Sequence, residues 1–231
     1  MLNKVCCSCA QDVLYRDMRF VCPKAHWTLS TSRHLARRVR LFSFSTETSI
    51  RGAPPVNYVK KTLAKALRNM TSLRNLKLLM GRDSNILDGC TFKLEVFSSD
   101  FAYDKSLRKF LNRQPSLTTI EFLKEDNDLS NLEATCLPNL TQVTASFSSL
   151  KYIIPGRPIS DVSRHLITDD SPDDLNFFTL STSPILKLTT TYSCLYPTST
   201  HLLASIFPSL THLSITTRKY EVRGPLLLFI E

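Results

Sequence analysis

One short pattern of apolar residues is repeated along this chain, and it limits the folds that the chain can adopt. It consists of a leucine, two residues, a second apolar residue, one polar residue and a third apolar residue. The second and third apolar positions are separated by one residue, which places both side chains on the same face of a short β-strand. The four clearest copies are MTSLRNLKLL at 70–79, QPSLTTIEFL at 114–123, CLPNLTQVTA at 136–145 and FPSLTHLSIT at 207–216.

The spacing of these copies is regular. Weaker copies start at Leu94, Ile159 and Ile185, so the first apolar positions fall at 73, 94, 117, 140, 159, 185 and 210. The steps between them are 21, 23, 23, 19, 26 and 25 residues. All but the step of 19 lie within the range of roughly 20–29 residues that is typical of leucine-rich repeats, which this chain resembles. An earlier strand, expected within residues 34–44 and including residues 38–41, would begin the series.

Segments with helical periodicity lie between the expected strands. They are residues 56–69, 104–113, a segment that opens at 171, and 198–207, whereas 147–160 is expected to hold only a helical turn and a proline-rich loop. A helix–strand unit cannot bury its apolar face alone, but stacked units bury a continuous core. The sequence therefore predicts an α/β fold, an irregular leucine-rich-repeat solenoid with parallel strands on one face and helices on the other.

Positive charge is concentrated in the first third of the chain. Residues 1–82 hold 16 Lys and Arg against 3 Asp and Glu, whereas the remainder holds 13 against 17. One interpretation is a partner such as nucleic acid or another anionic ligand bound by residues 33–82. The other is a solvated face of one helix and one strand. The basic, acid-poor N-terminus also resembles a mitochondrial presequence.

No pattern in the sequence indicates catalysis, a cofactor or a membrane span. Only 5 glycines are present, and none forms a phosphate-binding loop. Cys6, Cys7, Cys9, Cys22 and His26 lack the paired spacing of a zinc site, and we expect buried thiols instead. Seven cysteines without an export signal favour a reduced protein in the cytoplasm or nucleus. We therefore expect a chain that is not an enzyme and that holds no metal and no cofactor.

Several phrases are similar to those of fungal F-box/leucine-rich-repeat proteins. They are YRDMRF at 15–20, LARRVRL at 35–41, ILDGCTF at 86–92, FSSDF at 97–101 and CLPNL at 136–140. In that family an N-terminal F-box binds a Skp-type adaptor of a cullin–RING ubiquitin ligase, and the repeats hold the protein to be ubiquitinated. The resemblance implies an N-terminal segment at 1–32 that follows an F-box, and a solenoid at 33–231 that is truncated at its C-terminus.

Two features depart from the family pattern. The body of an F-box is not recognisable, so adaptor binding is expected only if an F-box is completed. The asparagine that family members carry three residues after the third apolar position is replaced at Gly81, Glu125, Ser148 and Arg218. Irregular curvature is therefore expected.

The residues that alternate with the buried ones along each strand predict the partner-binding surface. In repeat proteins they project to the concave side. The expected row is basic at its first end and nearly neutral after Glu121. Its members are Arg38, Arg40, Asn75, Lys77, Val96, Ser98, Thr119, Glu121, Gln142, Thr144, Lys187, Thr189, His212 and Ser214.

Overall fold

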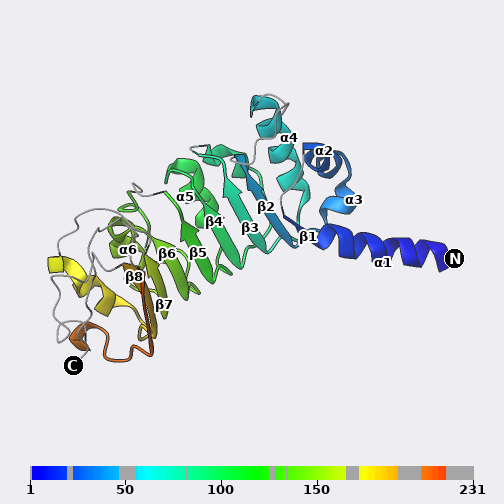
Figure 1. Cartoon of the computed structure of the whole chain (residues 1–231). Helices are drawn as coiled ribbons and strands as arrows, with labels where there is room; N and C mark the ends of the chain where they lie inside the picture. The colour runs from blue at the N-terminus through cyan, green and yellow to red at the C-terminus, as the bar shows by residue number, and fades with distance from the viewer. Residues whose placement is uncertain are drawn as a thin grey trace, which may run out of the picture.

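The chain folds around one parallel β-sheet. The computed structural model describes residues 2–19, 23–46, 56–81, 83–124, 128–133, 135–164, 172–191 and 204–216. The sheet has nine strands, and each pairs in parallel with the next one in the sequence (Figure 1). The strands are β1 (Asp17–Met18), β2 (Leu41–Ser45), β3 (Asn75–Leu79), β4 (Val96–Ser99), β5 (Thr119–Phe122), β6 (Gln142–Ala145), β7 (Asp161–Arg164), β8 (Lys187–Thr191) and β9 (His212–Thr216).

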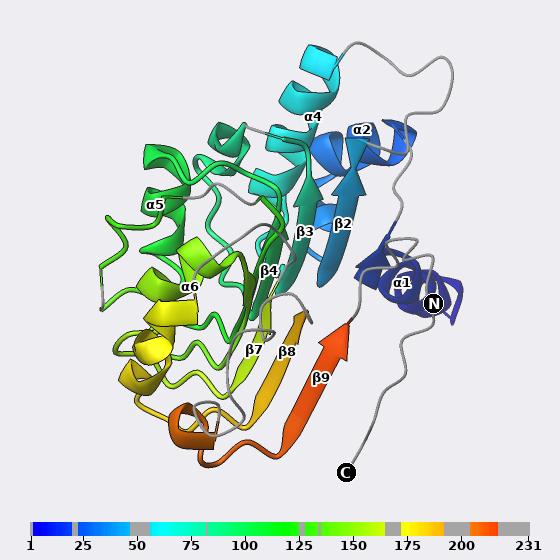
Figure 2. The same ribbon diagram turned by 60° about the vertical axis from the view of Figure 1, so that its left-hand side comes forward.

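Helices form a second layer. Figure 2 shows α4, α5 and α6 along one side of the sheet, and α2 beside α4 at its N-terminal end. The helices are α1 (Leu2–Arg16), α2 (Pro23–Thr31), α3 (Arg33–Ala36), α4 (Val56–Asn69), α5 (Lys105–Leu111) and α6 (Phe147–Ile153), with 3-10 segments η2 (Ser84–Leu87) and η3 (Pro172–Leu180). This arrangement is the leucine-rich-repeat solenoid that the sequence predicts.

The repeated apolar positions build the core between the two layers. Leu73, Leu94, Leu117, Leu140 and Ile159 are each at most 1% exposed, so the first position of five repeats is fully enclosed. The second positions line up across the sheet because register pairs each with the next. They are Phe42, Leu76, Phe97, Ile120, Val143, Val162, Leu188 and Leu213.

One backbone contact recurs at the start of strands β3 to β9. At β4, the N–H groups of Glu95 and Val96 both donate to the carbonyl of Arg74, the residue that directly precedes β3. The same double acceptance is repeated by the carbonyls of Arg40, Glu95, Thr118, Thr141, Ser160 and Leu186. Because each carbonyl belongs to the preceding repeat, the contact ties every repeat to its neighbour.

Threonine hydroxyls reinforce this backbone ladder in the absence of the usual asparagine. Thr118 Oγ1 donates to Glu95 O at 3.0 Å, Thr141 Oγ1 to Thr118 O at 3.3 Å and Thr211 Oγ1 to Leu186 O at 2.9 Å. Each of these carbonyls already accepts two backbone N–H groups, so the threonine hydroxyl is a third donor to the same oxygen. The threonine that precedes the strand therefore adds a side-chain contact between neighbouring repeats.

A fully buried arginine, Arg157, holds the turn that follows α6. The Arg157 guanidinium donates to the carbonyls of Cys136 at 2.8 Å, Ile153 at 2.6 Å and Glu133 at 2.7 Å. Ile153 ends α6, where carbonyls lack helical partners. Arg157 thus links the end of α6 to the loop of the preceding repeat.

Helices predicted from periodicity are confirmed in the middle of the chain. The helix at 56–69 is α4, and the helix at 104–113 is α5 with Asp104 as its N-cap. The Asp104 side chain accepts from Leu107 N at 2.8 Å, as expected of a capping aspartate. The segment that opens at 171 is the 3-10 segment η3 where it is described, and most of 198–207 lies outside the described residues.

The N-terminal region differs from the sequence prediction in two respects. The expected first strand within residues 34–44 is confirmed only from Leu41, where β2 begins, because residues 33–36 form α3 and residues 38–40 precede the strand. The expected buried thiols are also wrong, because Cys6, Cys7 and Cys9 are exposed on α1. Strand β1 lies within the segment 1–32, and the division of the chain at residue 33 stays a prediction.

Candidate interaction surface

The outward side chains of the sheet form two rows that run across all the repeats. Parallel pairing in register places equivalent residues of neighbouring strands side by side, and the side chains between buried positions face away from the core. The first row is Asn75, Val96, Thr119, Gln142, Asp161, Lys187 and His212. The second row is Ser43, Lys77, Ser98, Glu121, Thr144, Ser163, Thr189 and Ser214.

Polar contacts link neighbouring members of the rows. Lys77 Nζ lies 3.7 Å from Glu121 Oε2, and the Ser98 hydroxyl between them donates to the same carboxylate oxygen. Thr119 Oγ1 donates to Gln142 Oε1 at 3.1 Å. These contacts join side chains of strands β3 to β6 across the outward face of the sheet.

Exposure increases toward the last strands. Ser98 is only 5% exposed, whereas Gln142, Lys187, His212 and Ser214 are exposed. Most members of the second row are small hydroxyl residues, which allow a partner backbone to approach closely and offer both donors and acceptors. The later strands therefore present the more accessible half of the surface.

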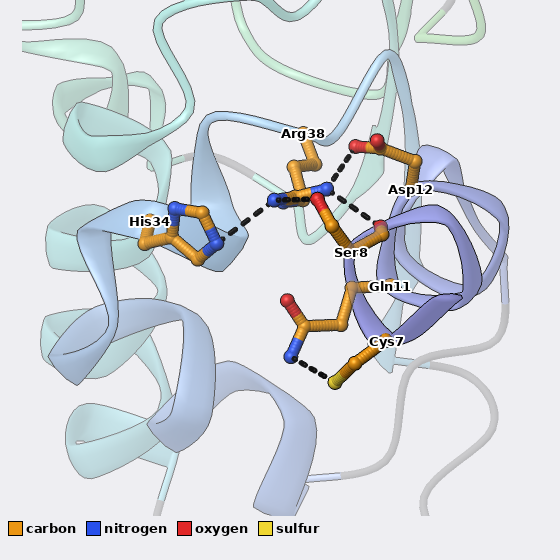
Figure 3. A network of polar contacts seen from close by, with 6 residues as sticks. All are labelled: Cys7, Ser8, Gln11, Asp12, His34 and Arg38. Carbon is orange, nitrogen blue, oxygen red and sulfur yellow. Dashed lines mark hydrogen bonds and ion pairs between the residues drawn. The ribbon is translucent and has the colours of Figure 1, made fainter. Parts of the chain in front are cut away.

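Arg38 and Arg40 do not belong to these rows, which corrects their predicted place. Figure 3 shows the Arg38 guanidinium directed toward α1, where it donates to Ser8 O at 2.9 Å and pairs with Asp12. Its other nitrogen lies 2.9 Å from His34 Nε2, which accepts because arginine has only donors. Arg40 directly precedes β2, and its Nη1 donates to Ser72 O at 3.1 Å.

The net charge of the strand face is consequently closer to zero than the net charge predicted from the sequence. Without the two arginines, the cations of the rows are Lys77 and Lys187, and the anions are Glu121 and Asp161. Lys77 and Glu121 largely compensate each other because they lie in contact. Among the described residues, much of the positive charge of the first third belongs to the helix layer, because Arg33 lies on α3 and Lys60, Lys61, Lys65 and Arg68 lie on α4.

Three row members escaped the sequence analysis. Ser43 was missed because the row was expected to begin with Arg38 and Arg40. The apolar positions of this repeat are Val39, Phe42 and Phe44, spaced three and two residues apart as in the other repeats, and Ser43 lies between the last two. Asp161 and Ser163 flank the buried Val162. Alternation around these apolar residues is the signal that identifies all three.

Chemistry-bearing groups elsewhere do not assemble into a reactive centre in the described ranges. Burial raises the pKa of Cys90 to about 12 and that of Cys136 to about 11, so these thiols are far from the reactive thiolate form at neutral pH. Within the same residues, no group of three or more His, Cys, Asp or Glu is placed to hold a metal. His26 is buried between aromatic rings, and Cys22 lies outside the described residues.

No helix in the described part of the chain is long and apolar enough to span a bilayer.

Comparisons with known proteins give one structural neighbour. No family model matches the chain, and no curated protein matches it. The leucine-rich repeat-containing protein LegL7 from Legionella pneumophila is similar in structure, with a TM-score of 0.49 and 11% identity over 81% of this chain and 70% of that protein. The fold is assigned from the register of the sheet itself, and nothing about function follows from this neighbour.

Proposed function

We propose that this chain is a protein-interaction module without catalytic activity, and that it holds a protein partner against the two outward rows of its sheet. The observation that supports this is the continuity of those rows, the first across seven neighbouring strands and the second across eight. Repeat proteins use such extended, stiff surfaces to bind partners. Small hydroxyl side chains with a few compensated charges suit a polypeptide better than a polyanion.

We also propose a more specific role, as the substrate-recognition part of an F-box ubiquitin-ligase adaptor in the cytoplasm or nucleus. The support is the resemblance of phrases such as ILDGCTF at 86–92 and CLPNL at 136–140 to fungal F-box/leucine-rich-repeat proteins. The partner would then be a protein destined for ubiquitination, and the Skp-type adaptor would join only through a completed F-box.

The strand face is tested by paired surface substitutions. A partner is first identified by proximity labelling with the full chain, and its binding is then measured for Gln142→Arg/Thr144→Arg. Two bulky cations in the middle of the rows should weaken binding by tenfold or more, which is about 1.4 kcal/mol or more. The matched control is Asn112→Arg/Thr179→Arg, which adds the same charge at exposed positions after α5 and in η3.

Two results would contradict the proposal. An equal loss in the control pair would mean that charge alone decides binding, and a loss confined to the control pair would move the partner to the helix side. The ligase role is tested separately by co-purification with a Skp-type adaptor. Weak or no association of this chain alone is expected, and a stoichiometric complex would show that residues 1–32 complete an F-box.

A further inference from the structure

Three arginines from two helices converge on one cleft on the helix side of the sheet. Arg33 and Arg37 come from α3 and its C-cap, and Arg68 comes from the last turn of α4. Together with Asn69 and Thr71 they line a cleft of about 240 Å³. The three arginines and Thr71 are exposed, so their donor groups are accessible to a solute.

The charge in this cleft is not compensated within the described part of the chain. None of the ion pairs found there involves Arg33, Arg37 or Arg68. Arg33 and Arg37 are four residues apart, one helical turn from each other, where like charges repel. Each helix C-terminus contributes at most about half a negative charge, so the two helix ends do not balance three guanidinium groups.

One of the three arginines is held in place by the neighbouring repeat. Arg68 Nε donates to Asp88 O at 2.8 Å, which leaves its other N–H groups free to turn toward the cleft. Its guanidinium lies against Gly89, where a β-carbon would come within 3.3 Å of Arg68 Nε. Gly89 has a φ of +79°, which glycine adopts without strain. The Gly89 turn therefore positions Arg68.

We propose that this cleft binds a phosphate monoester, independently of the strand face. A monoester carries close to two negative charges and three acceptor oxygens at neutral pH, and arginine forks match this geometry. The Thr71 hydroxyl adds a donor at the rim. The space suits one phosphate group and part of the residue or sugar that carries it.

A nucleic-acid strand fits the cleft less well. Single-stranded nucleic acids are held by a groove that follows the backbone and by aromatic rings that stack on bases. The side chains that line this cleft include no aromatic ring. On the adjacent face of α4, Lys60 is paired with Asp83, which lowers the charge available to extend the site.

The test is calorimetric titration of the full chain with four probes. They are inorganic phosphate, a short peptide with one phosphoserine, the same peptide without phosphate, and a single-stranded RNA oligonucleotide. Binding of the phosphoserine peptide but not of its unphosphorylated form is expected, and the comparison with inorganic phosphate tells whether the peptide contributes contacts. No binding of either phosphate probe would overturn the proposal.

Two variants and a control distinguish this cleft from diffuse charge. Arg37→Glu should weaken binding of the phosphate probes by about tenfold or more, and Arg68→Lys should weaken it less, because it keeps the charge but loses the planar fork. Lys65→Glu makes the same charge change on α4 outside the cleft and should leave binding within about twofold. All three residues are exposed, so the variants are expected to fold, and thermal melts check this. Equal losses for Arg37→Glu and Lys65→Glu, or tighter binding of RNA than of the phosphopeptide, would contradict the proposal.

Discussion

Strand β2, next to the first end of the sheet, and strand β9, at the other end, carry the same apolar pattern but bury it to very different degrees. On β2, Phe42 is 0% exposed and lies between β1 and β3, with His26 of α2 packed against it. On β9, the equivalent Leu213 is 47% exposed and Ile215 is 45% exposed. In the described residues β9 pairs only with β8. The comparison shows that the repeat pattern selects the strand, whereas burial depends on the repeats and helices that lie next to it.

The largest expected effect on stability concerns the central repeats, whose core leucines are fully buried because each of these repeats has a neighbour on both sides. Leu117→Ala or Leu140→Ala should lower the free energy of unfolding by about 2–5 kcal/mol, because each leaves a cavity in a packed core. Both leucines are 0% exposed. Denaturant unfolding followed by circular dichroism measures the change. A loss below about 1 kcal/mol would mean that the core is not packed as the register requires.

The covered end of the sheet should also show a pH dependence. Burial lowers the pKa of His26 from 6.5 to about 4, and neither of its ring nitrogens has a hydrogen-bond partner among the described residues. Above pH 6.5 the imidazole is neutral in both states, so stability is unaffected. As pH falls from about 6.5 to about 4, only the unfolded chain takes up the proton, and stability should fall by on the order of 3 kcal/mol.

His26→Phe provides the control for this prediction. A phenyl ring at this position can keep the contacts with Phe42 and with Phe44, whose ring centroid lies 4.8 Å from that of His26. The variant should lose less stability than the native chain between pH 6.5 and pH 4. Identical pH profiles for both proteins would mean that other groups cause the acid sensitivity.

The smallest expected effect concerns the exposed end. Leu213→Ala should change the free energy of unfolding by less than about 1 kcal/mol, because much of the side chain is already in water. Thermal unfolding beside Leu117→Ala gives the direct contrast. A loss as large as that of Leu117→Ala would show that β9 is covered in solution, and the difference between the two ends would disappear.

The repeat spacing was sufficient to predict the parallel solenoid and most of its strands. The prediction worked where three apolar residues mark a strand, as at Leu117, Ile120 and Phe122. It failed at residues 38–40, because alternation of Arg and Val imitates a strand, whereas the true anchors are Val39, Phe42 and Phe44. Helices α1 to α3 carry no repeat pattern, so spacing does not reveal them.

The two surfaces differ in how far the sequence could predict them. Alternation along each strand correctly placed twelve of the fourteen expected row residues on the outward face, and the partner that they bind stays a prediction. The arginine cleft could not be predicted, because Arg37 and Arg68 are far apart in the sequence and meet only after α3 packs beside α4. Local patterns specify a strand face, whereas a site between helices depends on tertiary packing.

Register is the property on which both the core and the two outward rows depend, and a cysteine cross-link tests it most directly. Thr144 and Ser163 are paired on β6 and β7 and face the same side. Neighbouring strands lie about 5 Å apart, within reach of a disulfide. Thr144→Cys/Ser163→Cys should therefore form a cross-link under mild oxidation, identified by peptide mapping, whereas Thr144→Cys/Thr189→Cys should not, because β7 separates those strands. A cross-link in the second pair, or none in the first, would contradict the parallel register.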